Sequence, residues 1–203
     1  MSQPSIKEVI QQQYTMCAKD PIFFMRQYCY IQHPKQGKIK FNLYQFQEDS
    51  LSELRDNRYS VILKSRQLGI STLSAGFALW SMLFKEDFNV LVIATTQEVA
   101  KNLVTKVRVM HDNLPSWLKG TIEADNKFKN GSQIKAVSSA TTGARSEALS
   151  LLIIDEAAFI RNIQEIWIAS QATLSTGGGA IVLSTPNGVG NWFHKTWVDG
   201  ETN

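Results

Sequence analysis

The stretch Lys64-Ser-Arg-Gln-Leu-Gly69-Ile-Ser71-Thr72 decides the fold, because it joins an apolar strand to a helix. The strand is predicted at 59–64, and apolar residues at helical spacing predict the helix near 71–85. A phosphate-binding loop belongs at such a junction. Backbone amides at a helix N-terminus point at the anion, and the helix dipole favours negative charge there.

The stretch fits the phosphate-loop pattern G-x-x-x-x-G-K-[S/T] only in part. Gly69 and Ser71 fit, whereas Ile70 occupies the lysine position and Lys64 occupies the first glycine position. The flexible stem of Lys64 can curl back over the loop and neutralise the β- and γ-phosphates. Ser71 would ligate Mg²⁺, and Arg66 would reach the γ-phosphate. Taken alone, the stretch is equally compatible with an ordinary strand–loop–helix turn.

A second apolar strand ends in two carboxylates. Leu151-Leu-Ile-Ile154 predicts a buried strand, and Asp155 and Glu156 follow it directly. In parallel sheets the ligand binds at this edge. Asp155 would hold the hydration shell of Mg²⁺, and Glu156 would polarise the water that attacks the γ-phosphate. The alternative is a strand that ends in acidic residues by chance, and the upstream loop makes this alternative weaker.

A third apolar strand is predicted at 180–184 and runs into Ser184-Thr185-Pro186-Asn187-Gly188. Pro-Asn-Gly is typical of a turn, which is the favoured interpretation from these residues alone. Ser184, Thr185 and Asn187 would also be in a position to sense the γ-phosphate from the same edge of the sheet.

Three more residues are candidates for nucleotide contact. Tyr44 and Gln47 precede the first strand, and a stacked ring and an amide are able to read adenine. On a helix, however, such residues usually serve packing and solvation. Arg145 lies in a loop of small residues before the acidic strand. It would either project towards the nucleotide of a neighbouring subunit or be solvated.

The remaining elements predict an α/β fold. Helices are predicted near 44–56, 96–113 and 162–174, a strand at 89–94, and a hairpin within 121–137 that contains Asn130-Gly131. Near-continuous apolar strands that alternate with helices indicate a parallel sheet covered on both faces.

The first 42 residues are predicted to form a helical lead-in to a domain that covers 43–203. Asp20-Pro21 is a helix-start pair, and His33-Pro-Lys-Gln-Gly37 breaks the helix that follows. Lys35, Lys38 and Lys40 form a small basic cluster, either a solvated loop or a contact for DNA or phosphate.

Composition excludes several classes of protein. Of the 203 residues, 43% are hydrophobic and 19% charged, which is typical of a globular chain rather than a disordered one. No apolar run is long enough for a membrane span, and the N-terminus has no signal-peptide core. Cys17 and Cys29 do not make a disulfide framework, and with His33 they lack metal-site spacing, so we expect structural roles and a reducing compartment. The formal charge of +3 does not decide on a nucleic-acid partner.

Taken together, these motifs resemble a known family. Their order is Leu43-Tyr-x-Phe-Gln47, the stretch from Lys64 to Ser71, Ile154-Asp-Glu-Ala-Ala-Phe159, and Ser184-Thr-Pro-Asn-Gly188. This order resembles the ATPase domain of the large terminase subunit of tailed bacteriophages, of the T-even-like myophage type. The resemblance implies an ASCE-type P-loop fold with a mainly parallel sheet. It also implies Mg²⁺-dependent ATP hydrolysis that drives double-stranded DNA into a procapsid.

The resemblance also assigns roles to individual residues. It implies catalytic roles for Glu156, for Arg66 as an internal finger and for Arg145 acting in trans around a ring. It makes Ser71 and Asp155 the metal ligands, and Ser184, Thr185 and Asn187 the coupling motif. The residues expected to contact the nucleotide are Tyr44, Gln47, Lys64, Ser65, Gln67, Leu68, Gly69, Ile70, Ser71 and Thr72.

The implied partners are double-stranded DNA, a portal protein, a small terminase subunit and further copies of the chain in a ring, with no membrane. The implied location is the cytoplasm of the infected bacterium and, transiently, the procapsid. Ile70 departs from the pattern of many relatives. The family's full-length protein also carries a ribonuclease-H-like nuclease domain. This sequence shows no second carboxylate cluster that would match such a domain, so no nuclease activity is expected. Two rival functions are a superfamily-2-type helicase core and a degenerate, non-hydrolysing module that binds portal or DNA.

Overall fold

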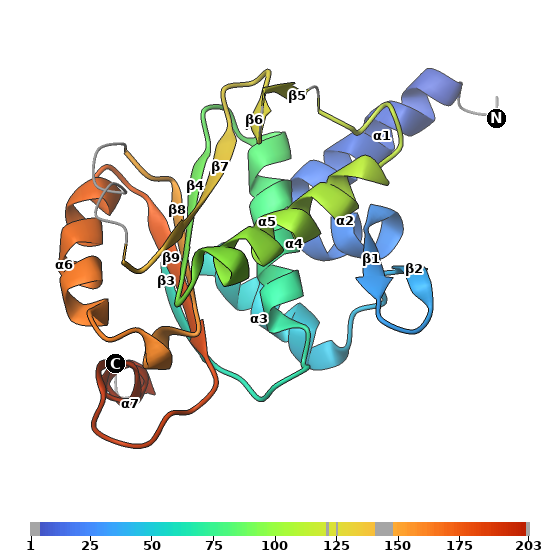
Figure 1. The fold of residues 1–203 in the computed structure, drawn as a ribbon. Coiled ribbons are helices and arrows are strands. Elements are labelled where there is room, and N and C mark those ends of the chain that lie inside the picture. Colours follow the sequence, from blue (N-terminus) through green and yellow to red (C-terminus); the bar gives the residue numbers. More distant parts are fainter. Residues whose placement is uncertain (1–4, 121, 125, 141–147, 202–203) are drawn as a thin grey trace.

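The computed structural model describes residues 5–120, 122–124, 126–140 and 148–201. Figure 1 shows a central twisted sheet with helices on both faces. Within the described residues the sheet has seven strands in the order β3-β9-β8-β4-β7-β6-β5. The strands are β3 (Tyr59–Leu63), β4 (Asn89–Ala94), β5 (Ile122–Ala124), β6 (Lys127–Phe128), β7 (Gln133–Ser138), β8 (Leu151–Asp155) and β9 (Gly179–Ser184).

The predicted parallel sheet is confirmed. β3, β9, β8, β4 and β7 pair in parallel, while β6 and β5 add an antiparallel edge. The predicted hairpin is present too, because β6 and β7 pair antiparallel around Asn130-Gly131. Gly131 has φ +85°, and a Cβ there would lie 1.9 Å from Asp87 Oδ1, so only glycine fits this turn without movement.

Four predicted helices begin and end within one residue of the observed ones. These are α3 (Gln45–Asp56), α4 (Ile70–Phe84), α5 (Gln97–Asp112) and α6 (Ile163–Leu174). The sequence did not predict the 3-10 turn η2 (Ala157–Phe159) or helix α7 (Trp192–Glu201). η2 follows β8 and α7 follows β9, and both segments are too short to show a clear hydrophobic periodicity.

The strands are apolar on both faces because each face is covered. Val92 and Ile153 pack in a cluster with α4 and α5, whereas Ile93 and Ile154 pack in a second cluster with α6 and η2. Alternate residues therefore face opposite layers, as the pleat requires. This arrangement explains why these strands read as continuous apolar runs rather than as alternating ones.

The N-terminal segment packs on the same core as the sheet. It forms α1 (Ile6–Lys19), α2 (Pro21–Tyr28) and a separate antiparallel hairpin of β1 (Tyr30–His33) and β2 (Gly37–Lys40). Cys17 and Cys29 are free and buried in the cluster that contains α4. The break at 33–37 is confirmed as a turn. The loop interpretation of the flanking residues is wrong, because they pair as short strands.

The start of α2 is the predicted one, since the Ile22 amide donates to Asp20 Oδ1 at 2.9 Å and Pro21 is the first helical residue. None of the helices in the described ranges is both long and apolar enough to cross a membrane.

Candidate functional site

The loop after β3 meets the start of α4 at the carboxyl edge of the sheet. The Lys64 amide donates to the Ser184 carbonyl at 3.0 Å, which extends the pairing of β3 with β9 by one residue. Gln67 and Gly69 both have positive φ, at 63° and 73°. The chain therefore reverses sharply before α4 begins at Ile70, and the free amides of the first helical turn face the loop.

The Lys64 side chain lies at the centre of the site. Its Nζ is 3.0 Å from Glu156 Oε1, 3.3 Å from Asp155 Oδ1 and 3.4 Å from Ser71 Oγ. The Lys64 side chain is 9% exposed. The ammonium group is therefore surrounded by three oxygens, two from the end of β8 and one from the start of α4. The Lys64 side chain thus reaches from the end of β3 to the start of α4 and the acidic pair. Its reach to the β- and γ-phosphates stays a prediction.

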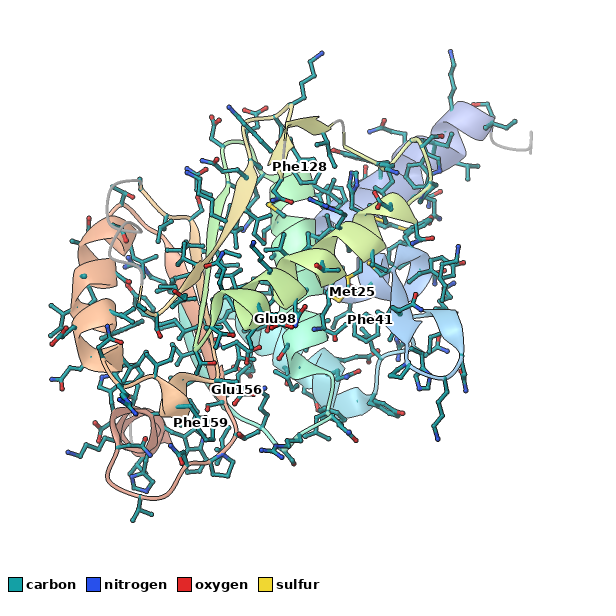
Figure 2. All side chains as sticks on the ribbon, viewed as in Figure 1. Met25, Phe41, Glu98, Phe128, Glu156 and Phe159 are labelled. Atoms are coloured by element: carbon teal, nitrogen blue, oxygen red, sulfur yellow. The ribbon has the colours of Figure 1, made fainter. Side chains whose placement is uncertain are left out.

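Glu156 is held in an unusual backbone conformation at the end of β8. Its φ is 56° and its ψ is 40°, the left-handed region that a non-glycine residue rarely adopts. Its amide donates to Asp155 Oδ1 at 2.9 Å, and Thr185 Oγ1 donates to its Oε2 at 3.3 Å. These contacts aim the carboxylate along the edge of the sheet, where Figure 2 labels Glu156. Strained residues of this kind cluster at functional sites.

The end of β9 is bonded to the turn that follows β8. The Ala158 amide donates to Ser184 Oγ at 3.1 Å, and Asn187 Nδ2 donates to the Ala158 carbonyl at 3.0 Å. Together with the Thr185 contact to Glu156, these bonds tie the Ser-Thr-Pro-Asn segment to the acidic pair. The segment is thus more than the simple turn that its residues alone favour.

Gln47 contacts the loop itself. It is 2% exposed, its Nε2 donates to the Leu68 carbonyl at 2.9 Å, and its Oε1 accepts the Tyr44 amide at 3.1 Å. A Cβ at Gly69 would lie 2.8 Å from the same Nε2, so the amide fits against the glycine. Tyr44 is 68% exposed and stacks on Phe46, which leaves its ring at the surface.

The other predicted residues divide into buried and exposed ones. Ile70 is 4% exposed and packs in the core cluster of α4, so its side chain belongs to the core. Thr72 is half-buried within the first turn of the helix. The exposed loop residues are Ser65, Arg66, Gln67 and Leu68. Arg145 lies outside the described residues.

Lys106 on α5 is a neighbour of the site that the sequence did not identify. Burial lowers the pKa of Lys106, while the charge of Asp155 raises it and that of Lys64 lowers it further. Lys106 therefore interacts electrostatically with Asp155. The spacing of Lys106 was the signal that could have identified it. Lys106 shares one stripe of α5 with Leu103, Val107 and Met110, and these three residues are buried.

The donor set suits a cation bound by oxygen ligands. A hydroxyl and two carboxylates converge within 3.4 Å of one point, which the Lys64 ammonium occupies. Mg²⁺ prefers such ligands, and it is usually held by one or two carboxylates together with substrate phosphates. No group of three or more His, Cys, Asp or Glu suited to a metal occurs in the described part of the chain. The residues fit Mg²⁺ that arrives with a nucleotide.

This geometry agrees with a comparison with known families. Residues 61–201 match the family described as terminase large subunit, T4likevirus-type, N-terminal. The chain belongs to this family. The match begins within β3 and ends with α7, so it includes the phosphate loop, the acidic pair and the segment after β9.

Solved terminases share the fold. The large terminase ATPase domain of Thermus phage P74-26 has a TM-score of 0.65 and 20% identity, over 76% of this chain and 69% of that one. The large terminase of bacteriophage HK97 has a TM-score of 0.70 and 16% identity, over 91% of this chain and 41% of that one. This chain therefore spans most of an isolated terminase ATPase domain and less than half of the HK97 terminase. The predicted ASCE-type P-loop fold is confirmed.

The helicase interpretation has weaker support. The UvsW helicase of bacteriophage T4 has a TM-score of 0.64 and 15% identity, over 89% of this chain and 64% of that one. At this identity the likeness shows a shared fold and nothing about activity. The family match decides for the terminase large subunit and its ATPase domain.

Proposed function

We propose that this chain hydrolyses ATP and that the reaction drives double-stranded DNA into a procapsid. The observation that carries the proposal is the Lys64 ammonium group among Ser71, Asp155 and Glu156 at 3.0–3.4 Å. A further support is a relative, the large terminase of a thermophilic bacteriophage, whose structure was determined in complex with ATP-gamma-S. That terminase has a TM-score of 0.56 and 15% identity, over 78% of this chain and 42% of that one.

Nucleotide binding would redirect Lys64. A triphosphate seated on the amides at the start of α4 carries more negative charge than the two carboxylates that Lys64 now contacts. The flexible lysine would therefore turn to the β- and γ-phosphates. Mg²⁺, held by Ser71 and Asp155, would supply positive charge to the phosphate oxygens. Arg66, exposed in the loop, would add charge near the γ-phosphate.

The same movement would free the base. Glu156 Oε1 now accepts from Lys64, and Oε2 is held by Thr185 at 3.3 Å. Once Lys64 has turned to the phosphates, Oε1 is able to accept a proton from the attacking water while Thr185 keeps the carboxylate oriented. The lysine would thus link substrate binding to the activation of the base.

Loss of the γ-phosphate would be transmitted through Ser184, Thr185 and Asn187, because they bond the end of β9 to the Glu156 turn. We propose DNA, a portal protein, a small terminase subunit and further copies of the chain in a ring as partners, with Arg145 acting in trans. The proposed location is the cytoplasm of the infected bacterium and the procapsid. Nuclease cleavage is not proposed for residues 1–203.

Steady-state phosphate release tests the proposal, with Glu156→Gln as the decisive variant. The amide keeps the shape of the side chain but is no base, so turnover should fall by about 10²–10⁴-fold. Binding of a fluorescent ATP analogue should be retained. Glu165→Gln, an exposed residue in the first turn of α6, is the matched control and should turn over like the wild type. Equal turnover in all three proteins would remove Glu156 from the mechanism.

A further inference from the structure

The hairpin β1–β2 stands apart from the central sheet. Tyr30 pairs with Lys40, Ile31 with Ile39 and Gln32 with Lys38. Ile31 packs against the core, and β1 contacts α5. Because side chains alternate along a strand, the opposite face of the hairpin carries Lys38, Lys40 and their cross-strand partners. In Figure 1 the hairpin lies on the side of the molecule opposite α6.

This outer face is cationic. Lys35, Lys38 and Lys40 are all exposed, and none has an ion pair with a described residue. Between Asp20 and Glu48 the sequence contains no acidic residue. The Lys38 ammonium lies 5.7 Å from the centroid of the Tyr30 ring, which holds its stem along the hairpin. The lysines therefore present positive charge that nothing in the described part of the chain neutralises.

Lys35 lies exposed in the turn between the two strands. The His33 Nδ1 accepts the Lys35 and Gln36 amides, both at 3.2 Å. Gly37 has φ +67°, which closes the tight reversal after Pro34. The hairpin therefore holds Lys35, Lys38 and Lys40 on a hydrogen-bonded backbone.

The surroundings favour a polyanion over a protein partner. Protein interfaces are centred on aromatic or aliphatic anchors. No large hydrophobic side chain between residues 17 and 43 is exposed. A two-stranded ribbon fits the major groove of B-DNA, which is about 12 Å wide, and lysines bind phosphates without reading sequence.

We propose that the hairpin, through Lys35, Lys38 and Lys40, contacts the phosphate backbone of double-stranded DNA. The proposal rests on the proposed function, since it names the surface that would hold the polymer. The hairpin is also close in sequence to the nucleotide site. Phe41, labelled in Figure 2, donates its amide to the Cys29 carbonyl at 3.0 Å, and α3 with Gln47 follows directly.

The test compares two triple variants of the 203-residue chain. The hairpin variant is Lys35→Ala/Lys38→Ala/Lys40→Ala. The control variant, Lys7→Ala/Lys101→Ala/Lys195→Ala, removes the same charge from exposed positions on α1, α5 and α7. Binding to a short fluorescent duplex is measured by anisotropy from about 50 to 200 mM salt, the range over which phosphate contacts dominate.

The hairpin variant should bind duplex DNA on the order of 10- to 100-fold more weakly at about 0.1 M salt, with a salt slope smaller by up to ~2.7. The control should stay close to the wild type in slope. Equal weakening of both variants, an unchanged hairpin variant, or a wild type that does not bind duplex DNA would overturn the proposal. So would unchanged DNA binding together with lost binding of poly-L-glutamate, which would indicate an acidic protein partner.

Turnover of ATP without DNA separates this proposal from the proposed function. The hairpin lysines are outside the nucleotide site, so basal phosphate release should be unchanged in the hairpin variant. Loss of DNA binding with intact phosphate release supports the hairpin as the DNA-binding surface. Absence of phosphate release in the wild type would contradict the proposed function, whatever the anisotropy shows.

Discussion

Lys64 Nζ lies 3.0 Å from Glu156 Oε1, so the proposed phosphate-binding cation and the proposed catalytic base form an ion pair. They directly follow β3 and β8, strands that are separated in the sheet by β9. In this pair Glu156 Oε1 accepts a hydrogen bond from Lys64. In the proposed mechanism, a bound triphosphate is the stronger anion that draws Lys64 away and frees Glu156.

Lys64→Met tests whether Lys64 itself, rather than any positive charge near the site, is the phosphate-binding cation. The variant keeps an unbranched side chain that is one atom shorter and loses the charge, so turnover should fall by about 10²–10³-fold as charge stabilisation is lost. Affinity for a fluorescent ATP analogue should fall as well. Lys106→Met is the matched control, because Lys106 is half-buried and feels the charge of Asp155 but belongs to α5 and not to the loop. A Lys64→Met protein with wild-type affinity and turnover would refute the displaced-lysine mechanism.

Gln47→Ala should destabilise the fold because it removes a hydrogen bond to the loop after β3. The substitution leaves the Leu68 carbonyl and the Tyr44 amide without their side-chain partners, at a site that is 2% exposed. Each lost bond to a buried group costs about 1–3 kcal/mol, so the free energy of unfolding should fall by at least about 1 kcal/mol. Urea denaturation measures this change. Gln45→Ala changes an exposed residue of the same helix whose side chain donates to Asp49 Oδ1, and it should change this free energy by less than about 0.5 kcal/mol. Equal effects of the two substitutions would contradict a stabilising role for the Gln47 hydrogen bonds.

The parts of the fold that sequence predicts well are those with long apolar patterns. Leu151–Ile154 is apolar throughout because both faces of β8 are covered, and the repeat over α4 spans four turns. The hairpin at 30–40 was missed because each strand has four residues, too few for alternation to stand out. Glu156 was identified from its place after an apolar strand, which is a local signal.

The contacts of the site depend on tertiary distance, which a single sequence does not contain. Gln47 lies 21 residues before Leu68, and its bond to that carbonyl appears only once α3 packs beside the loop. A lysine within an amphipathic helix is usually solvated, so Lys106 gave no reason to expect a neighbour of Asp155. That Lys64 comes within 3.4 Å of Ser71 agrees with the flexible stem on which the prediction relied.

The two thiols should make stability fall at alkaline pH. Burial raises the pKa of Cys17 from 9.0 to about 12, with repulsion from Asp20 as the smaller cause, and burial also raises the pKa of Cys29. Above about pH 9 the unfolded chain loses protons that the folded chain keeps. The free energy of unfolding therefore falls as pH rises from about 9 towards 12, by up to about 1.4 kcal/mol per pH unit for each thiol.

Urea unfolding in the presence of a reductant, at pH values from about 7 to 10, measures this slope. Cys17→Ala lowers stability at every pH but should make the alkaline slope shallower. Burial lowers the pKa of Lys106 and of Lys85, which adds a slope of opposite sign below their ordinary value of 10.5. That contribution is common to wild type and variant, so the difference between them isolates the thiol. Identical slopes would show that Cys17 does not titrate in this way.

Ile70→Lys tests whether the usual lysine position of a phosphate loop is available in this chain. Ile70 is 4% exposed in the core cluster of α4, so a lysine there loses apolar packing and buries an ammonium group. The free energy of unfolding should fall by about 2–5 kcal/mol, the range for removing a large core side chain. Ile70→Met, which conserves volume, should cost less than about 1.5 kcal/mol. Ile70→Lys placed in the Lys64→Met background should not restore phosphate release, because the side chain at position 70 belongs to the core while that at position 64 lies at the acidic pair. Recovery of turnover in that double variant would show that a lysine from the helix start reaches the phosphates after all, and that Lys64 is not the only possible source of the cation.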